Sequence, residues 1–271
     1  MRFSERMGIT PVRDTIQEES MDDALRNGLW NMFYALYSWR RAHDEHPGLF
    51  GRVCADCFKE PLDTLPRRFD EASDFIRRRY FEFDWHEVYD FIQFVADDLE
   101  DPRDERFRDV CNTILKREMS AYRFVGGQLT RITSEEEIAA IEEALQVPDP
   151  YSPVRSHLAQ ALALMSDREA PDYRNSIKES ISAVEALCII IAGETKATLG
   201  KALSTLEEQY PLHGALKSAF SSLYGYASGA DGIRHALLDE DELQFEDAKF
   251  MLVACSAFVN YMIAKAAGDG S

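Results

Sequence analysis

The 271-residue sequence lacks a long hydrophobic segment. Its longest apolar runs, such as LCIII (187–191) and FMLVACSAFV (250–259), fall short of the roughly 18 residues that a membrane-spanning helix needs. The N-terminal stretch MRFSERMGIT has no apolar signal region, so no export is expected. Five cysteines, an odd number, fit reduced thiols better than a disulfide framework. We therefore expect a cytoplasmic protein without a membrane partner.

The sequence also lacks a basic excess. It has 30 Lys and Arg against 48 Asp and Glu, which gives a net charge of −18. Proteins that hold long stretches of nucleic acid usually present a basic face, because phosphate neutralisation drives their affinity. The charge argues against broad, non-specific binding, but local clusters such as PRRF (66–69) leave room for a site that engages a few nucleotides. Neither GxxxxGK[ST] nor GxGxxG after a strand occurs, so nucleotide-signal binding ranks last.

A proline-rich stretch divides the chain. VPDPYSPV (147–154) holds three prolines in six residues, which cannot continue a helix and indicate a stiff linker. We predict a mainly α protein with a first domain over 1–146, a linker over 147–153 and a second domain over 154–271.

The first domain is predicted to be helical with one small β-hairpin. The stretch 22–41 places apolar residues at helical spacing, with Asp22 or Ser20 as its N-cap. In YRFVGGQLTRI (122–132), two short extended runs flank Gly126–Gly127, which predicts a hairpin. Ser134 and Glu137 have the spacing of a capping box before the next helix.

The second domain is predicted to be an antiparallel bundle of four or five helices. Ser152–Pro153 starts the first helix by the cap-then-proline rule. The long apolar helix that begins near Tyr173 is stopped by Gly193. The last helix, FEDAKFMLVACSAFVNYMIAKAA (245–267), starts acidic and carries a lysine near its end, and both features suit the helix dipole.

Two stretches of the first half carry a family resemblance. FSERMGITPVRDTIQEESMDDALRNGLWN (3–31) and SAYRFVGGQLTRITSEEEIAAIEEAL (120–145) resemble the N-terminal domain of AbiJ-type abortive-infection proteins of bacteria. The resemblance covers roughly residues 1–146. It implies a role in defence against phage, with this domain sensing a trigger or binding a partner.

The second half resembles a divergent HEPN helical domain. The resemblance is carried by PDYRNSIKESISAVEALC (171–188), LYGYASGADGIRHALLDE (223–240) and DAKFMLVACSAFVNYMI (247–263). HEPN domains are compact helical bundles, commonly dimeric, and many are metal-independent ribonucleases in toxin and phage-defence systems. The resemblance therefore implies a homodimer, an RNA substrate and no cofactor.

The HEPN catalytic motif is an arginine, four to six residues and a histidine, and this sequence departs from it. Arg234 occupies the arginine position in context, but the expected histidine falls on Asp239 or Glu240. His235 follows Arg234 directly. A histidine can act as general base or acid, and an arginine can hold a scissile phosphate. The alternative is a structural charged pair.

Three residues of the apolar helix complete the candidate site. Glu185 lies in SISAVEALCIII (180–191), where a buried carboxylate needs a partner, and Arg234 or His235 could supply it. It is assigned with them as catalytic; an exposed, unpaired glutamate is the alternative. Arg174 and Asn175 begin the same helix and could bind a phosphate, or only cap the helix.

A second constellation has the composition of a zinc site. RAHDEHPGLFGRVCADC (41–57) contains His43, His46, Cys54 and Cys57, a possible tetrahedral ligand set. A lone CxxC within a helical pattern also fits small residues that face a core. We favour the core interpretation and expect no metal.

The two resemblances together imply a conditional, metal-independent endoribonuclease of bacterial phage defence. Its expected partners are a second copy, an RNA, and a phage-derived trigger or a co-encoded protein. The alternative, from another functional class, is a non-catalytic dimerising adaptor or regulatory partner of another effector, which the acidic charge and the missing histidine favour.

Overall fold

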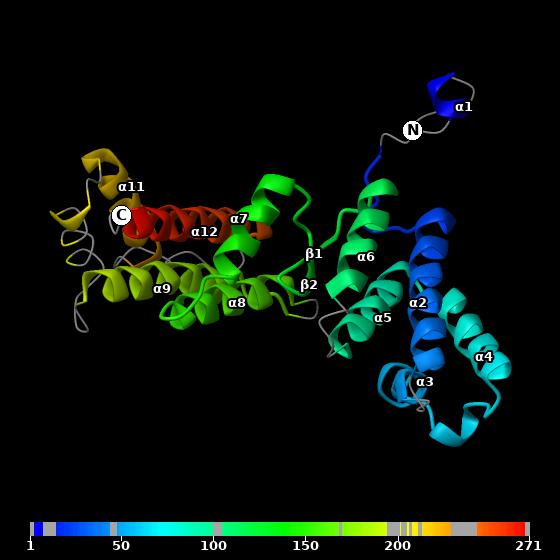
Figure 1. Ribbon diagram of the computed structural model, residues 1–271. Helices are drawn as coiled ribbons and strands as arrows, with labels where there is room; N and C mark the ends of the chain where they lie inside the picture. The colour runs from blue at the N-terminus through cyan, green and yellow to red at the C-terminus, as the bar shows by residue number, and fades with distance from the viewer. Residues whose placement is uncertain are drawn as a thin grey trace. The chain divides into compact units, whose positions relative to one another are not determined.

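The chain is mainly α-helical with one antiparallel hairpin, as predicted (Figure 1). The computed structural model describes residues 3–7, 15–43, 48–99, 105–167, 170–193, 201, 205, 208–210, 213–228 and 243–268. Its elements are α1 (Phe3–Arg6), α2 (Asp23–His43), α3 (Gly48–Arg52), the π-helix η1 (Val53–Cys57), the 3-10 helix η2 (Leu62–Thr64), α4 (Phe69–Glu82), α5 (Trp85–Asp97), α6 (Glu105–Arg117), β1 (Arg123–Val125), β2 (Gln128–Thr130), α7 (Glu135–Leu145), α8 (Ser152–Ser166), α9 (Tyr173–Ala192), α11 (Gly214–Ser228) and α12 (Phe245–Gly268).

The chain forms two compact units that divide between Arg131 and Ile132. The proline-rich stretch 147–153 lies inside the second unit, where it connects α7 to α8. Helix α7 therefore packs with the second unit, although the division expected from the sequence left it with the first domain. The domain bounds expected from the sequence, 1–146 and 154–271, stay a prediction.

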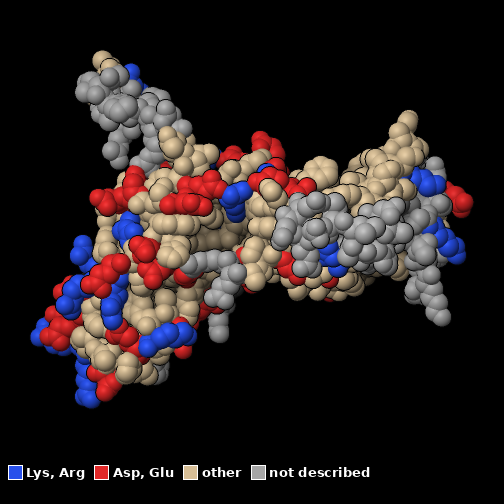
Figure 2. Space-filling model, turned by 180° about the vertical axis from the view of Figure 1, so that it is seen from behind, with Lys and Arg blue, Asp and Glu red and all other residues tan. Residues whose placement is uncertain are grey.

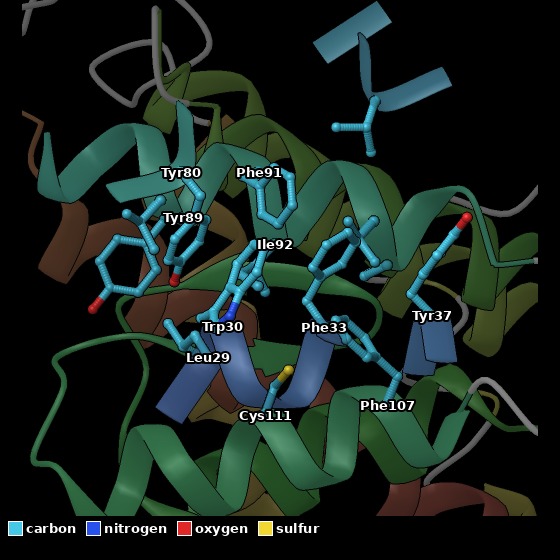
Figure 3. Close-up of a cluster of buried hydrophobic side chains, with 14 of the residues drawn as sticks. Leu29, Trp30, Phe33, Tyr37, Tyr80, Tyr89, Phe91, Ile92, Phe107 and Cys111 are labelled. Carbon is cyan, nitrogen blue, oxygen red and sulfur yellow. The ribbon is translucent and has the colours of Figure 1, made fainter. Parts of the chain in front are cut away.

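An aromatic core holds the first unit together. Leu25, Leu29 and Phe33 of α2 are fully buried, at the helical spacing that the sequence indicates. The Phe33 ring meets Phe91 of α5 edge-on at 4.8 Å, and Trp30 lies 5.2 Å from the Tyr80 ring of α4 (Figure 3). Such pairs add to the free energy gained from burying their area. The core thus fixes α2, α4 and α5 against one another.

The hairpin turns at the predicted glycines. Gly126 and Gly127 both have positive φ, 54° and 91°, as a two-residue type I′ turn requires, and Phe124 pairs with Leu129 across the strands. A two-stranded sheet has two open edges, and at each edge a side-chain amide forms hydrogen bonds with the backbone groups of that edge. Asn112 of α6 donates to the Phe124 carbonyl (2.9 Å) and accepts from the Phe124 N–H (2.7 Å).

Gln93 of α5 serves the other edge. Its amide oxygen accepts from the Leu129 N–H (2.7 Å), and its amide nitrogen donates to the Gly127 carbonyl (3.0 Å). The two amides replace the missing neighbouring strands and tie the hairpin to α5 and α6.

The segment 15–20 is held at the end of α6. The Gln17 N–H donates to the Met119 carbonyl (2.8 Å), and the Ala121 N–H donates to the Gln17 carbonyl (2.9 Å). The Gln17 side chain adds a bond to the Glu118 carbonyl (2.6 Å) and is itself buried. This segment leads into α2, where Asp22 accepts from the Leu25 N–H (2.9 Å) as the predicted N-cap.

In the second unit, α8 and α9 pack as an antiparallel pair. The Ser176 hydroxyl donates to the Ala161 carbonyl (2.7 Å), and the Asp172 N–H donates to the Leu164 carbonyl (2.9 Å). Residue numbers rise along α9 as they fall along α8, which gives the direction. Helix α9 ends at Gly193 in the left-handed region, as predicted, and Pro153 lies in the first turn of α8.

Helix α12 packs on α9, α7 and α8. Lys249 pairs with Glu137 of α7 (3.3 Å), and the Asn260 amide donates to the Ala140 carbonyl (2.9 Å). The Ser134 hydroxyl accepts from the Glu137 N–H, as the predicted capping box requires, and it donates to Glu136. The Glu137 carboxylate is engaged by α12, so only half of the box matches the prediction.

Within the described residues, α12 is the one helix long and apolar enough to cross a membrane by length and composition. The core helix of a soluble protein passes the same test. Here Leu252, Cys255 and Val259 are fully buried against the unit. Continuous runs in the sequence understate this helix, because single polar residues interrupt an otherwise apolar segment.

Replacing Asn112 with alanine is expected to destabilise the first unit. The change leaves two backbone groups of Phe124 without their partner, at a cost of about 1–3 kcal/mol in unfolding free energy. All three tryptophans lie within residues 1–131, so their fluorescence during urea unfolding follows this unit. Thr113→Ala, at an exposed neighbour, should change the free energy by less than about 0.5 kcal/mol. Equal unfolding midpoints for both variants would contradict the assigned role.

Candidate functional site

Two of the five predicted site residues lie outside the described residues. Arg234 and His235 fall in a stretch that the structure does not describe, and so does His46 of the zinc hypothesis. The remaining site residues, Arg174, Asn175 and Glu185, all lie on α9. Their positions show what α9 can contribute to a site.

Arg174 and Glu185 share one side of α9 but lie far apart. Eleven residues are about three turns, so the two side chains leave the helix in similar directions, about 16 Å apart along its axis. Both are half-buried. They cannot contact the same phosphate, and within one chain they mark the two ends of a surface strip.

Asn175 is engaged in capping its own helix. Asp172 is the N-cap of α9 and accepts from the Asn175 N–H (2.9 Å). The Asn175 amide nitrogen donates to the same carboxylate (2.6 Å), and its oxygen accepts from Lys178 (3.1 Å). Phosphate binding through Asn175 requires these bonds to be exchanged, and that role stays a prediction.

Glu185 lies near a buried thiol. Burial raises the pKa of Cys188 to about 12, and the nearby Glu185 carboxylate contributes to the rise. A half-buried carboxylate at this position is available to a partner that approaches the apolar part of α9. The predicted partners, Arg234 and His235, are outside the described residues.

The structure brings together one pair that the sequence did not indicate. His157 of α8 lies with Nδ1 2.6 Å from Oε2 of Glu179 on α9, and both side chains are partly exposed. A carboxylate that holds one ring nitrogen fixes the orientation of an imidazole, which is how many general bases are positioned. The two residues are 22 positions apart and meet only because α8 and α9 are antiparallel, so no local pattern signals them.

The cysteines of the zinc hypothesis belong to the first unit's core. Cys54 is fully buried, and its Sγ lies 3.8 Å from the Glu60 carbonyl and 3.7 Å from the Pro61 carbonyl. Cys57 is partly buried against the same core, and burial raises the pKa of its thiol to about 11. In the part of the chain that the structure describes, no group of three or more His, Cys, Asp or Glu side chains is placed to hold a metal.

Charge is unevenly divided between the units. Residues 132–271 carry 10 Lys and Arg against 22 Asp and Glu, whereas residues 1–131 carry 20 against 26. In the first unit the basic side chains alternate with acidic ones over the visible face rather than forming a patch (Figure 2). Arg68 pairs with Asp70 (2.7 Å), and Arg79 pairs with Glu60. A nucleic acid would therefore meet a surface of mixed charge on the first unit and a second unit whose net charge is negative.

The buried thiols make the free energy of unfolding depend on pH in the alkaline range. Burial raises the pKa of Cys188 and Cys255 to about 12, against about 8.5 for a cysteine in an unfolded chain. Their contribution to stability is therefore complete below about pH 8.5 and is lost as the pH rises toward 12. We expect the urea midpoint, followed by far-ultraviolet circular dichroism, to hold between pH 7 and 8 and to fall above pH 9. A midpoint that rises above pH 9 would contradict this assignment.

The comparisons with known proteins agree with the first half of the chain. The family described as AbiJ N-terminal domain 4 matches residues 1–147, a stretch that spans the first unit and continues through α7. No curated protein and no solved structure gave a significant match. Since the match covers more than half of the 271 residues, the chain belongs to the AbiJ N-terminal domain 4 family, which associates it with abortive-infection defence against phage.

Proposed function

We propose that this protein is a two-part defence protein of the bacterial cytoplasm. Its first part, residues 1–146, senses a phage-derived trigger or binds a co-encoded partner. Its second part is a HEPN-like effector. The family match carries the defence role. The antiparallel packing of α8 and α9, with α12 along them, supports a helical bundle for the effector.

The proposed activity is conditional, metal-independent cleavage of RNA. One imidazole takes the proton of a ribose 2′-hydroxyl while that oxygen forms a bond to the adjacent phosphorus. The bond from phosphorus to the 5′-oxygen breaks, and the leaving oxygen takes up a proton. The products are a 2′,3′-cyclic phosphate and a 5′-hydroxyl. His235 is assigned to proton transfer, Arg234 to the phosphate and Glu185 to orienting them.

A second copy of the chain completes this site in the proposal. Were Arg234 and His235 on one helix, they would point about 100° apart and would not easily meet on one phosphate within one chain. A homodimer allows Arg234 of one protomer to act with His235 of its partner. Arg174, near the start of α9, is assigned to bind a flanking phosphate of the same RNA.

A specific observation favours a non-catalytic alternative. The second unit has 22 acidic against 10 basic residues, which repels a polyanion. A dimerising adaptor that regulates another effector has no need to attract RNA. In that case Arg234 and His235 are structural, and the acidic surface serves solubility or recognition of a basic partner.

RNA integrity in phage-infected bacteria separates the two functions. Cells carrying the wild type should show RNA fragments after infection, and cells carrying Arg234→Ala with His235→Ala should not. Glu185→Gln should reduce fragment yield at least about tenfold, because it removes a charge that orients the catalytic pair. Fragments are mapped by sequencing of 5′-hydroxyl ends.

The control variant removes one arginine, as the double substitution does, but at a position outside the proposed site. Arg78→Ala removes an exposed arginine of α4 and should cleave and protect like the wild type. Intact RNA together with phage protection that survives the double substitution would reject the ribonuclease and support the adaptor. Cleavage would also be rejected if the double substitution abolished protection while wild-type cells showed no RNA fragments after infection.

A further inference from the structure

Helix α12 presents an apolar stripe on the side that does not pack on the described elements of the second unit. Phe250 and Tyr261 are 59% and 39% exposed, and Ala257 and Ala264 are also exposed. Ala254 also belongs to this stripe. Successive members of the stripe are 4, 3, 4 and 3 residues apart, which keeps them on one face of the helix: Phe250, Ala254, Ala257, Tyr261 and Ala264. The opposite face, with Leu252, Cys255 and Val259, is buried, so α12 is apolar on both sides.

The stripe is self-complementary about Ala257. When two copies of α12 lie antiparallel with Ala257 at the two-fold axis, Phe250 faces Ala264 of the other copy, because both are seven residues from the axis. Tyr261 likewise faces Val253, four residues on the other side. Each large side chain thus opposes a small or half-buried one, as close packing of two helices requires.

The charges at the two ends of α12 suit the same arrangement. Glu246 and Asp247 lie in the first turn and Lys265 lies in the last. Antiparallel pairing brings Lys265 of one copy next to the partner's first turn, whereas parallel pairing brings acid to acid. Lys249, which comes opposite Lys265, is neutralised by Glu137 within its own chain. Opposite charges and opposed helix dipoles both favour the antiparallel pair.

We propose that the exposed face of α12 is a two-fold interface between two copies of this chain, with Ala257 on the axis. This interface is the surface through which the homodimer of the proposed function would form. The inference rests on the proposed function only for the choice of a second copy as the partner. The dimer forms whether or not the protein cleaves RNA, so measurements on purified protein test it independently.

Oligomeric state tests the interface directly. The full chain should sediment as a dimer, and Ala257→Glu should raise the dissociation constant about 100-fold or more, because two like charges meet at the axis. Ala163→Glu makes the same change at an exposed alanine of α8 and should stay dimeric. A wild type that is monomeric at all concentrations, or an Ala257→Glu variant as dimeric as the control, would overturn the proposal.

Cross-linking fixes the direction of the pair and does not depend on the fold tolerating a charge. In a Cys57→Ser background, which removes the half-buried native thiol, Ala257→Cys should link to itself through a short bismaleimide. Phe250→Cys and Ala264→Cys should link when mixed but not each alone, since like positions lie about 21 Å apart along antiparallel helices. Linking of Phe250→Cys to itself, or no linking at Ala257→Cys, would refute the arrangement.

A membrane is the competing occupant of an apolar helix face. Flotation of the wild type with vesicles of phosphatidylglycerol and phosphatidylethanolamine measures it. Recovery with the vesicles that is lost in Ala257→Glu would overturn the dimer interface in favour of lipid. Recovery of a dimeric protein in the unbound fraction supports it.

Discussion

The structure depends on one constraint: backbone groups buried outside helices must find hydrogen-bond partners. In the first unit, side-chain amides from distant positions meet it. Asn112 and Gln93 serve the two edges of the hairpin, and Gln17 serves the carbonyl of Glu118 where the N-terminal segment joins α6. Each bond is modest in net free energy, but an unpaired buried group costs more than the bond gains. Losing one amide therefore loosens the hairpin and the helix that supplies it together.

The same constraint explains what the sequence could predict. Asp22, Gly126–Gly127 and Gly193 act on groups within a few residues, so the N-cap, the turn and the helix end were all predictable. Asn112 and the His157–Glu179 pair act across the fold, where spacing carries no signal. The capping box at Ser134 illustrates the boundary: its local half forms, and α12 draws away the Glu137 carboxylate. For the candidate site, the sequence predicted that Arg174 and Glu185 share a helix and left two roles open for Asn175, of which the structure shows the capping one.

Helix α7 links two descriptions of this chain. By sequence it lies within the family match over 1–147, and by packing it belongs to the second unit. Its contacts with α12 are polar and specific, through Lys249 to Glu137 and Asn260 to the Ala140 carbonyl. Under the proposed function, a signal from the first domain would reach the effector through α7, because a shift of α7 must break or re-form these bonds.

Helix α12 shows why an apolar composition does not identify an environment. The same residues satisfy the length and hydropathy of a membrane span, fill the core of the second unit and leave a stripe exposed. What distinguishes these environments is how small and large side chains are distributed along the exposed face. A lipid surface places no demand on their order, whereas close packing against a second copy favours a large residue opposite a small one. In the proposed pair, Phe250 faces Ala264, and Ala257 on the axis is small enough for the helices to approach closely.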